Sequence, residues 1–63
     1  MTDKTARKLR GLRGDQTQAT VANAVGISIS AYSSYELGVR RPSDEVKKRL
    51  ADYFGTSVGE LFF

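Results

Sequence analysis

The fold is decided by residues 17–43, which read TQATVANAVGISISAYSSYELGVRRPS. Thr17 and Ser28 stand where helix N-caps are expected, because a side-chain oxygen there accepts a hydrogen bond from a free backbone N–H of the first turn. Gly26 stands between them, where a residue in the left-handed conformation commonly ends a helix. The stretch therefore predicts two short helices, one on each side of Gly26, joined by a tight turn.

The same helix signals recur on both sides of this stretch, and hairpin signals do not. The sequence holds no Asn-Gly or Asp-Gly turn and a single proline. Apolar residues at helical spacing, together with capping residues, predict five helices at about residues 3–13, 18–25, 28–37, 43–54 and 57–62. The connections between them are short, so we expect one compact all-α domain over residues 1–63.

The composition limits which functions the chain can have. With 63 residues and neither Cys nor His, it lacks the residues for disulfides and for the usual zinc sites. It also lacks a histidine for general acid–base catalysis and a glycine-rich phosphate loop. We therefore expect no enzymatic activity, no catalytic residues, no metal and no cofactor. No apolar stretch is long enough for a membrane span and no signal peptide begins the chain, so we expect a cytoplasmic protein without a membrane partner.

The charges are distributed unevenly around an uncharged centre. Five basic residues against one acidic residue give residues 1–13 a net charge of +4, and five against two give residues 40–49 a net charge of +3. Residues 16–35 carry no charged side chain. A neutral centre rich in amides and hydroxyls is typical of a surface that contacts phosphates at its edges and reads polar groups in the middle. A basic face exposed only to solvent is the alternative interpretation.

An ordered set of residues across this centre forms a helix-turn-helix pattern. In chain order the set is Thr17-Gln18, Ala22, Val25-Gly26-Ile27-Ser28, Ser33, Tyr35-Glu36, Gly38 and Arg40-Arg41-Pro42-Ser43. The pattern resembles the lambda-repressor-like DNA-binding domains of the Cro/CI (XRE) family of bacterial and phage regulators, and the match covers about residues 5–62. The resemblance implies a five-helix lambda-repressor-like fold and a bacterial or phage protein associated with the nucleoid.

The resemblance also implies which residues meet DNA. In that family the second helix lies across the DNA backbone and the third enters the major groove. Carried over by position, the base-facing residues are Ile29, Ser30, Ser33 and Ser34. The phosphate-contacting residues are Thr17, Gln18, Ser28, Gly38, Arg40 and Arg41. The base-facing set contains no Arg, Lys, Asn or Gln, so the strong bidentate base contacts are absent from it.

The residues and the resemblance together predict a sequence-specific transcriptional regulator of repressor type that binds double-stranded DNA. A single module of this size buries only about 600–1,000 Å² of protein surface on DNA, so we expect a homodimer on a two-fold symmetric site. The alternative is an interaction module of the same fold that binds a protein, as an antitoxin or an adaptor does. A steep fall in affinity with salt distinguishes DNA binding from this alternative.

Glu36 is expected to be at least partly buried and to pair with a basic residue of the first helix. Tyr32 and Tyr35 flank it at helical spacing and are predicted to lie in the core. A carboxylate among such residues needs a compensating charge, and Arg10 is the partner that the sequence favours.

Two further segments have more than one interpretation. Lys47, Lys48 and Arg49 follow one another in the fourth predicted helix, and we expect them to form a solvated face. Phe62 and Phe63 end the sequence, either as one core residue and one exposed aromatic or as the start of a dimer contact. The sequence leaves these two interpretations open.

Overall fold

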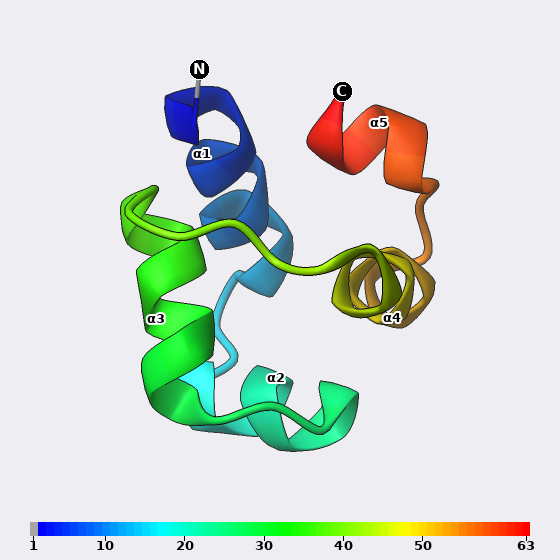
Figure 1. The fold of residues 1–63 in the computed structure, drawn as a ribbon. Coiled ribbons are helices and arrows are strands. Elements are labelled where there is room, and N and C mark those ends of the chain that lie inside the picture. Colours follow the sequence, from blue (N-terminus) through cyan, green and yellow to red (C-terminus); the bar gives the residue numbers. More distant parts are fainter. Residues whose placement is uncertain (1) are drawn as a thin grey trace.

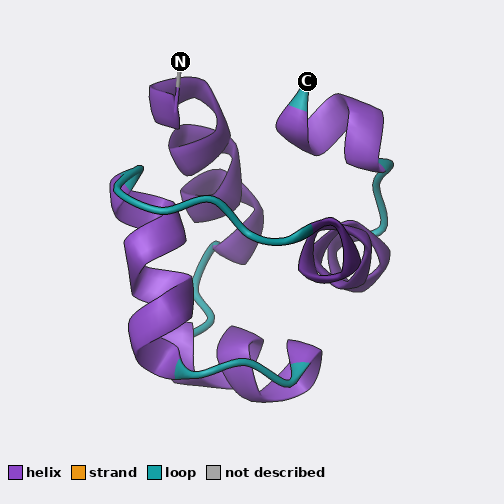
Figure 2. Cartoon of the chain, in the orientation of Figure 1, coloured by secondary structure: helices purple, strands orange, loops and turns teal. Residues whose placement is uncertain are grey.

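Residues 2–63 of the computed structural model form five α-helices joined by short loops (Figure 1). The helices are α1 (Thr2–Arg13), α2 (Gln18–Val25), α3 (Ile29–Leu37), α4 (Asp44–Phe54) and α5 (Val58–Phe62). Each begins and ends within one residue of its predicted range. Over the described chain there is no strand, as Figure 2 shows, and the predicted all-α fold is confirmed.

Capping residues explain why segments this short begin and end where they do. At the starts of α2 to α5, a side-chain hydroxyl accepts a hydrogen bond of 3.0–3.3 Å from the backbone N–H three residues later. These caps are Thr17, Ser28, Ser43 and Ser57. Gly26 and Gly38 end α2 and α3 with φ of 74° and 76°, where a side chain would be strained. Each cap satisfies backbone groups that a short helix would otherwise leave without partners.

The core lies where all five helices meet. α3 packs against α1 and α2, α2 against α4, and α5 against both α1 and α4. The largest fully buried side chains come from every helix and are Tyr32, Leu9, Leu50, Leu61 and Val21. Burying one such aliphatic side chain contributes roughly 1.5–3 kcal/mol, so these few residues supply much of the stability of a chain this short.

The packing bears on two predictions about aromatic residues. Tyr32 and Tyr35 are buried, with 0% and 7% of their surface exposed, which confirms their place in the core. Phe62 is half-buried against the core, whereas Phe63 is 84% exposed.

None of the helices that the structure describes is long and apolar enough to cross a membrane.

Candidate nucleic-acid interface

One side of α3 carries all four residues predicted to face bases. α3 lies at the edge of the molecule in Figure 1. Residues four apart are neighbours on a helix surface, so Ile29 lies beside Ser33 and Ser30 lies beside Ser34. Ile29 and Ser30 are exposed, whereas Ser33 and Ser34 are half-buried. The Ser34 hydroxyl donates a hydrogen bond of 3.0 Å to the Ser30 carbonyl oxygen. The Ser34 oxygen can therefore still accept a hydrogen bond from a further partner, whereas its single proton is already donated.

Leu37 extends this side of α3 beyond the serines, and a second exposed apolar residue, Val39, follows in the next loop. Leu37 follows Ser33 by four residues and is 69% exposed, and Val39 in the next loop is 70% exposed. The predicted site did not include them. The helical spacing that selects Ser33 selects Leu37 as well, so this extension could have been found from the sequence.

α2 begins at Gln18 and α3 at Ile29, and each follows directly on a residue whose hydroxyl caps the helix. Thr17 Oγ1 accepts a hydrogen bond from Thr20 N, and Ser28 Oγ accepts one from Ala31 N, both at 3.0 Å. The remaining backbone N–H groups of a first turn have no partner within the helix, and the helix dipole adds positive potential there. Such a terminus is suited to a phosphate group.

A buried charge network ties α3 to α1 and α2. Glu36 is only 2% exposed. Its carboxylate accepts hydrogen bonds from Arg13 Nε at 2.7 Å and Arg13 Nη2 at 3.1 Å, in a bidentate arrangement. The amide of Gln18 donates a third hydrogen bond to Glu36 Oε1, at 3.0 Å. The two helices of the helix-turn-helix are therefore joined to α1 through one carboxylate.

The predicted partner of Glu36 was wrong by one helical turn. Arg10 donates a hydrogen bond to the backbone carbonyl of Glu36, whereas Arg13 donates to the Glu36 carboxylate. Arg13 lies in the last turn of α1, from which its guanidinium also donates to the Gln16 carbonyl at 2.8 Å. It thereby bridges the loop before α2 and the end of α3, which a residue one turn earlier does not do.

The network sets the charge state of its members. Burial by itself raises the pKa of Glu36, but hydrogen bonds, above all from Arg13, outweigh burial and leave that pKa below its ordinary value. The same hydrogen bond raises the pKa of Arg13. Burial, helped by the neighbouring carboxylate, raises the pKa of Tyr32, whose hydroxyl has no hydrogen-bond partner among the described residues. Glu36 and Arg13 are therefore both charged near neutral pH.

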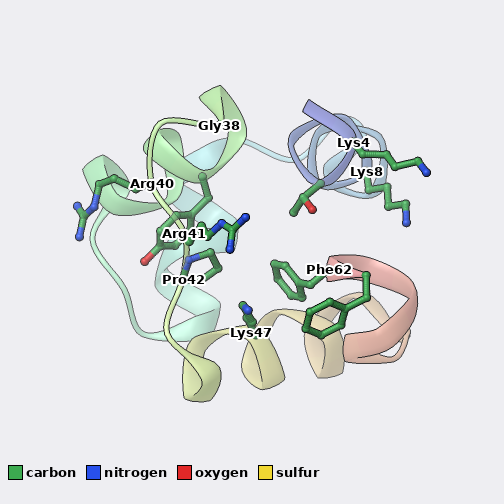
Figure 3. A pocket seen from close by; sticks show the side chains of 11 residues that line it. Lys4, Lys8, Gly38, Arg40, Arg41, Pro42, Lys47 and Phe62 are labelled. Carbon is green, nitrogen blue, oxygen red and sulfur yellow. The ribbon is translucent and has the colours of Figure 1, made fainter. Parts of the chain in front are cut away.

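The loop between α3 and α4 carries two arginines that point in different directions. In Figure 3, the Arg40 side chain extends away from Phe62 and Lys4, whereas the Arg41 side chain extends toward them. Both arginines are exposed, and Gly38 before them is half-buried. The six residues predicted to contact phosphates thus belong to two groups, one at the starts of α2 and α3 and one in this loop.

The family model described as "Helix-turn-helix" matches residues 4–61, nearly the whole chain. The chain belongs to the helix-turn-helix family. This membership agrees with the resemblance to the Cro/CI (XRE) family that the residue pattern indicated, and with the placement of α2, Gly26 and α3.

Among its relatives, this helix-turn-helix chain is similar to two regulators. It is 38% identical over 56 residues to the cryptic phage CTXphi transcriptional repressor RstR of Vibrio cholerae, covering 86% of this chain and 50% of that protein. It is 50% identical over 40 residues to the HTH-type transcriptional regulator AnsR of Bacillus subtilis (strain 168), covering 64% of this chain and 34% of that protein. The chain therefore spans half or less of these curated relatives. No solved structure matches it significantly.

Proposed function

We propose that this helix-turn-helix chain binds double-stranded DNA sequence-specifically, as the DNA-binding part of a repressor-type transcriptional regulator. One observation carries the proposal: α3 exposes a side of small neutral residues while the buried Glu36 network fixes its position against α1 and α2. A reading helix held in this way meets DNA without being ordered at the moment of binding. The two relatives, named as a transcriptional repressor and a regulator, support the same function.

In this proposal α3 enters the major groove with its exposed side toward the base edges. The Ile29 side chain, 50% exposed, contacts a thymine methyl, and the serine hydroxyls hydrogen-bond to base edges. Hydroxyls and methyl groups can be buried against bases without leaving an unpaired charge. Their discrimination is weaker than that of a bidentate pair, so DNA shape supplies part of the specificity.

The phosphate contacts lie on both sides of α3. The start of α2, with Thr17 and Gln18, and the cap Ser28 take one stretch of backbone, while Gly38, Arg40 and Arg41 take another. The amide of Gln18 is held by Glu36, so the backbone N–H groups at the start of α2 contribute beside the second N–H of that amide. Catalysis has no part in this function.

Two copies of the chain act together in the proposed complex. A two-fold symmetric site with half-sites one helical turn, about 34 Å, apart supplies the specificity that one small interface lacks. Both relatives come from bacteria or a bacterial phage, and the proposal accordingly places the chain on the DNA of a bacterial nucleoid.

The test begins with duplexes selected from a random pool and titrated at several salt concentrations. Arg40→Ala should weaken binding to all duplexes alike and lower the salt slope by about one. Ser33→Ala should change which sequences are preferred and leave the slope unchanged. Lys48→Ala removes the same charge from an exposed position of α4 and is the matched control, with little effect on either quantity.

A second titration tests the paired half-sites. Inserting five base pairs between them turns one half-site to the opposite face of the duplex, so tight binding should be lost. Equal affinity for the natural and the spaced duplex would show that one subunit reads its site alone. If no duplex is enriched and binding is independent of salt, DNA recognition is wrong and the protein-binding alternative takes its place.

A further inference from the structure

A pocket of about 390 Å³ lies beside the proposed DNA contact and shares Gly38, Arg40 and Arg41 with it. Its walls come from the first half of α1, the last turn of α3 with the loop that follows, the first turn of α4, and the end of α5 (Figure 3). The start of α1 and the end of α5 lie at the same end of the molecule, far from the start of α3 (Figure 1). A volume of this size falls in the range of small-molecule sites, about 300–1,000 Å³.

Positive charge dominates this pocket. Among the described residues, eleven line the pocket, of which five are basic and none is acidic; the basic ones are Lys4, Lys8, Arg40, Arg41 and Lys47. They are half of the ten lysines and arginines in the sequence. Lys8 Nζ donates to the Glu60 carbonyl oxygen at 2.6 Å, and Arg40 is turned outward. Arg41 and Lys47 are the basic side chains that extend into the middle of the pocket in Figure 3.

Lys47 differs from the solvated residue that the sequence predicted. Its side chain is only 16% exposed, and its ammonium group lies 5.6 Å and 5.2 Å from the ring centroids of Phe62 and Phe63. The Asp44 carboxylate is 4.0 Å away and fully exposed, so water screens this ion pair. Ring faces attract the ammonium without neutralising it. A largely buried positive charge therefore faces the pocket beside the Arg41 guanidinium.

The remaining wall is largely apolar. Tyr35 and Pro42 are both buried, and Phe62 extends from α5 into the pocket in Figure 3. Two aromatic rings and a proline ring present flat surfaces that suit a planar ligand body. The pocket thus combines two cationic groups with an apolar wall, which is the combination that an amphipathic anion requires.

We propose that this pocket binds a small organic anion, with a carboxylate or phosphate group between Arg41 and Lys47 and a planar apolar body against Phe62 and Tyr35. The site does not depend on the proposed function, because it forms in the chain without DNA.

The test is a calorimetric titration of the full chain without DNA, at constant ionic strength, with three probes. Phenyl phosphate combines both required features, inorganic phosphate has only the charge, and phenol has only the ring. Phenyl phosphate should bind at least about tenfold more tightly than either of the others, because it gains charge-assisted hydrogen bonds over phenol and the burial of an apolar ring over inorganic phosphate. Benzoate, titrated in the same way, distinguishes a carboxylate ligand from a phosphate ligand.

Variants locate the binding site. Arg41→Ala and Lys47→Met should each weaken phenyl phosphate binding about tenfold, whereas Lys48→Ala, a control at an exposed position of α4 that does not line the pocket, should stay within about twofold. Lys47→Met keeps a long side chain on the two phenylalanine rings, and a thermal melt verifies that each variant is folded. The proposal is overturned if inorganic phosphate binds as tightly as phenyl phosphate, or if folded Arg41→Ala and Lys47→Met variants bind like the original chain.

Discussion

Two ion pairs in this small domain have the same length and very different surroundings. Arg13 with Glu36 and Arg49 with Glu45 each have a nitrogen–oxygen distance of 2.7 Å. In the first pair the side chains are 23% and 3% exposed, and the pair joins α1 to α3. In the second they are 47% and 75% exposed, and both residues lie in α4, four positions apart.

The comparison shows that burial, rather than distance, decides what such a pair contributes. Water competes for both partners of the exposed pair, and pairs of this kind contribute about 0–1 kcal/mol. Around Glu36 there is little water, so a partner that is removed leaves a charge or a polar group without compensation. The buried pair also positions α3 against α1, whereas the exposed pair adds only to the stability of α4.

The largest expected effect comes from neutralising each glutamate in turn. Glu36→Gln should lower the melting temperature by about 5–15 °C, because a buried charge-assisted hydrogen bond is worth about 1–3 kcal/mol in a domain of this size. Glu45→Gln, the matched control, should lower it by less than about 5 °C. Circular dichroism melts at pH 7 measure both. Equal shifts in the two variants would mean that burial does not separate the pairs.

A smaller effect is expected from pH. The pKa of Glu36 is lowered in the folded state, so its contribution to stability is full above the ordinary value of 4.5 and is lost as the pH falls through the lower folded value. Urea unfolding of the original chain should therefore show stability falling with acid below pH 4.5 more steeply than in Glu36→Gln. Subtracting one curve of unfolding free energy against pH from the other cancels the contribution of the carboxylates that both proteins share. Parallel curves would contradict the lowered pKa.

The smallest effect is expected at Tyr32, in the buried region but outside the ion pair. Its hydroxyl is buried and has no hydrogen-bond partner in the described part of the chain. Tyr32→Phe keeps the ring and removes only that hydroxyl, so the melting temperature should stay within about 5 °C or rise. A fall as large as that of Glu36→Gln would show that the hydroxyl is a full member of the Glu36 network.

Much of the fold could be predicted because its signals are local. A threonine or serine cap and a left-handed glycine act within one turn of the chain, so the helix bounds followed from residues such as Thr17 and Gly26. The burial of Tyr32 and Tyr35 followed from their helical spacing. The charge pair within α4 is local too, since four residues bring Glu45 and Arg49 to the same face.

The candidate site likewise has a part that local sequence signals predict and a part that depends on how the helices pack. The side of α3 that carries Ile29 and the serines is fixed by helical periodicity, which the sequence contains in full. Whether these residues touch DNA stays a prediction. The role of Gln18 in holding Glu36 could not be predicted, because it depends on how α2 and α3 cross.

The sequence by itself determined five helices, four of them begun by a capping hydroxyl, an uncharged segment between basic blocks, and a glutamate that needs a partner. Only the tertiary structure decided that the partner is Arg13 and not Arg10, since the two lie one turn apart on α1 and the docking of α1 on α3 selects between them. It also decided that Arg41 and Lys47 converge on one pocket. The physical reason is range: caps and periodicity act over a few residues, whereas a pairing between helices depends on packing angles that no short stretch of sequence encodes.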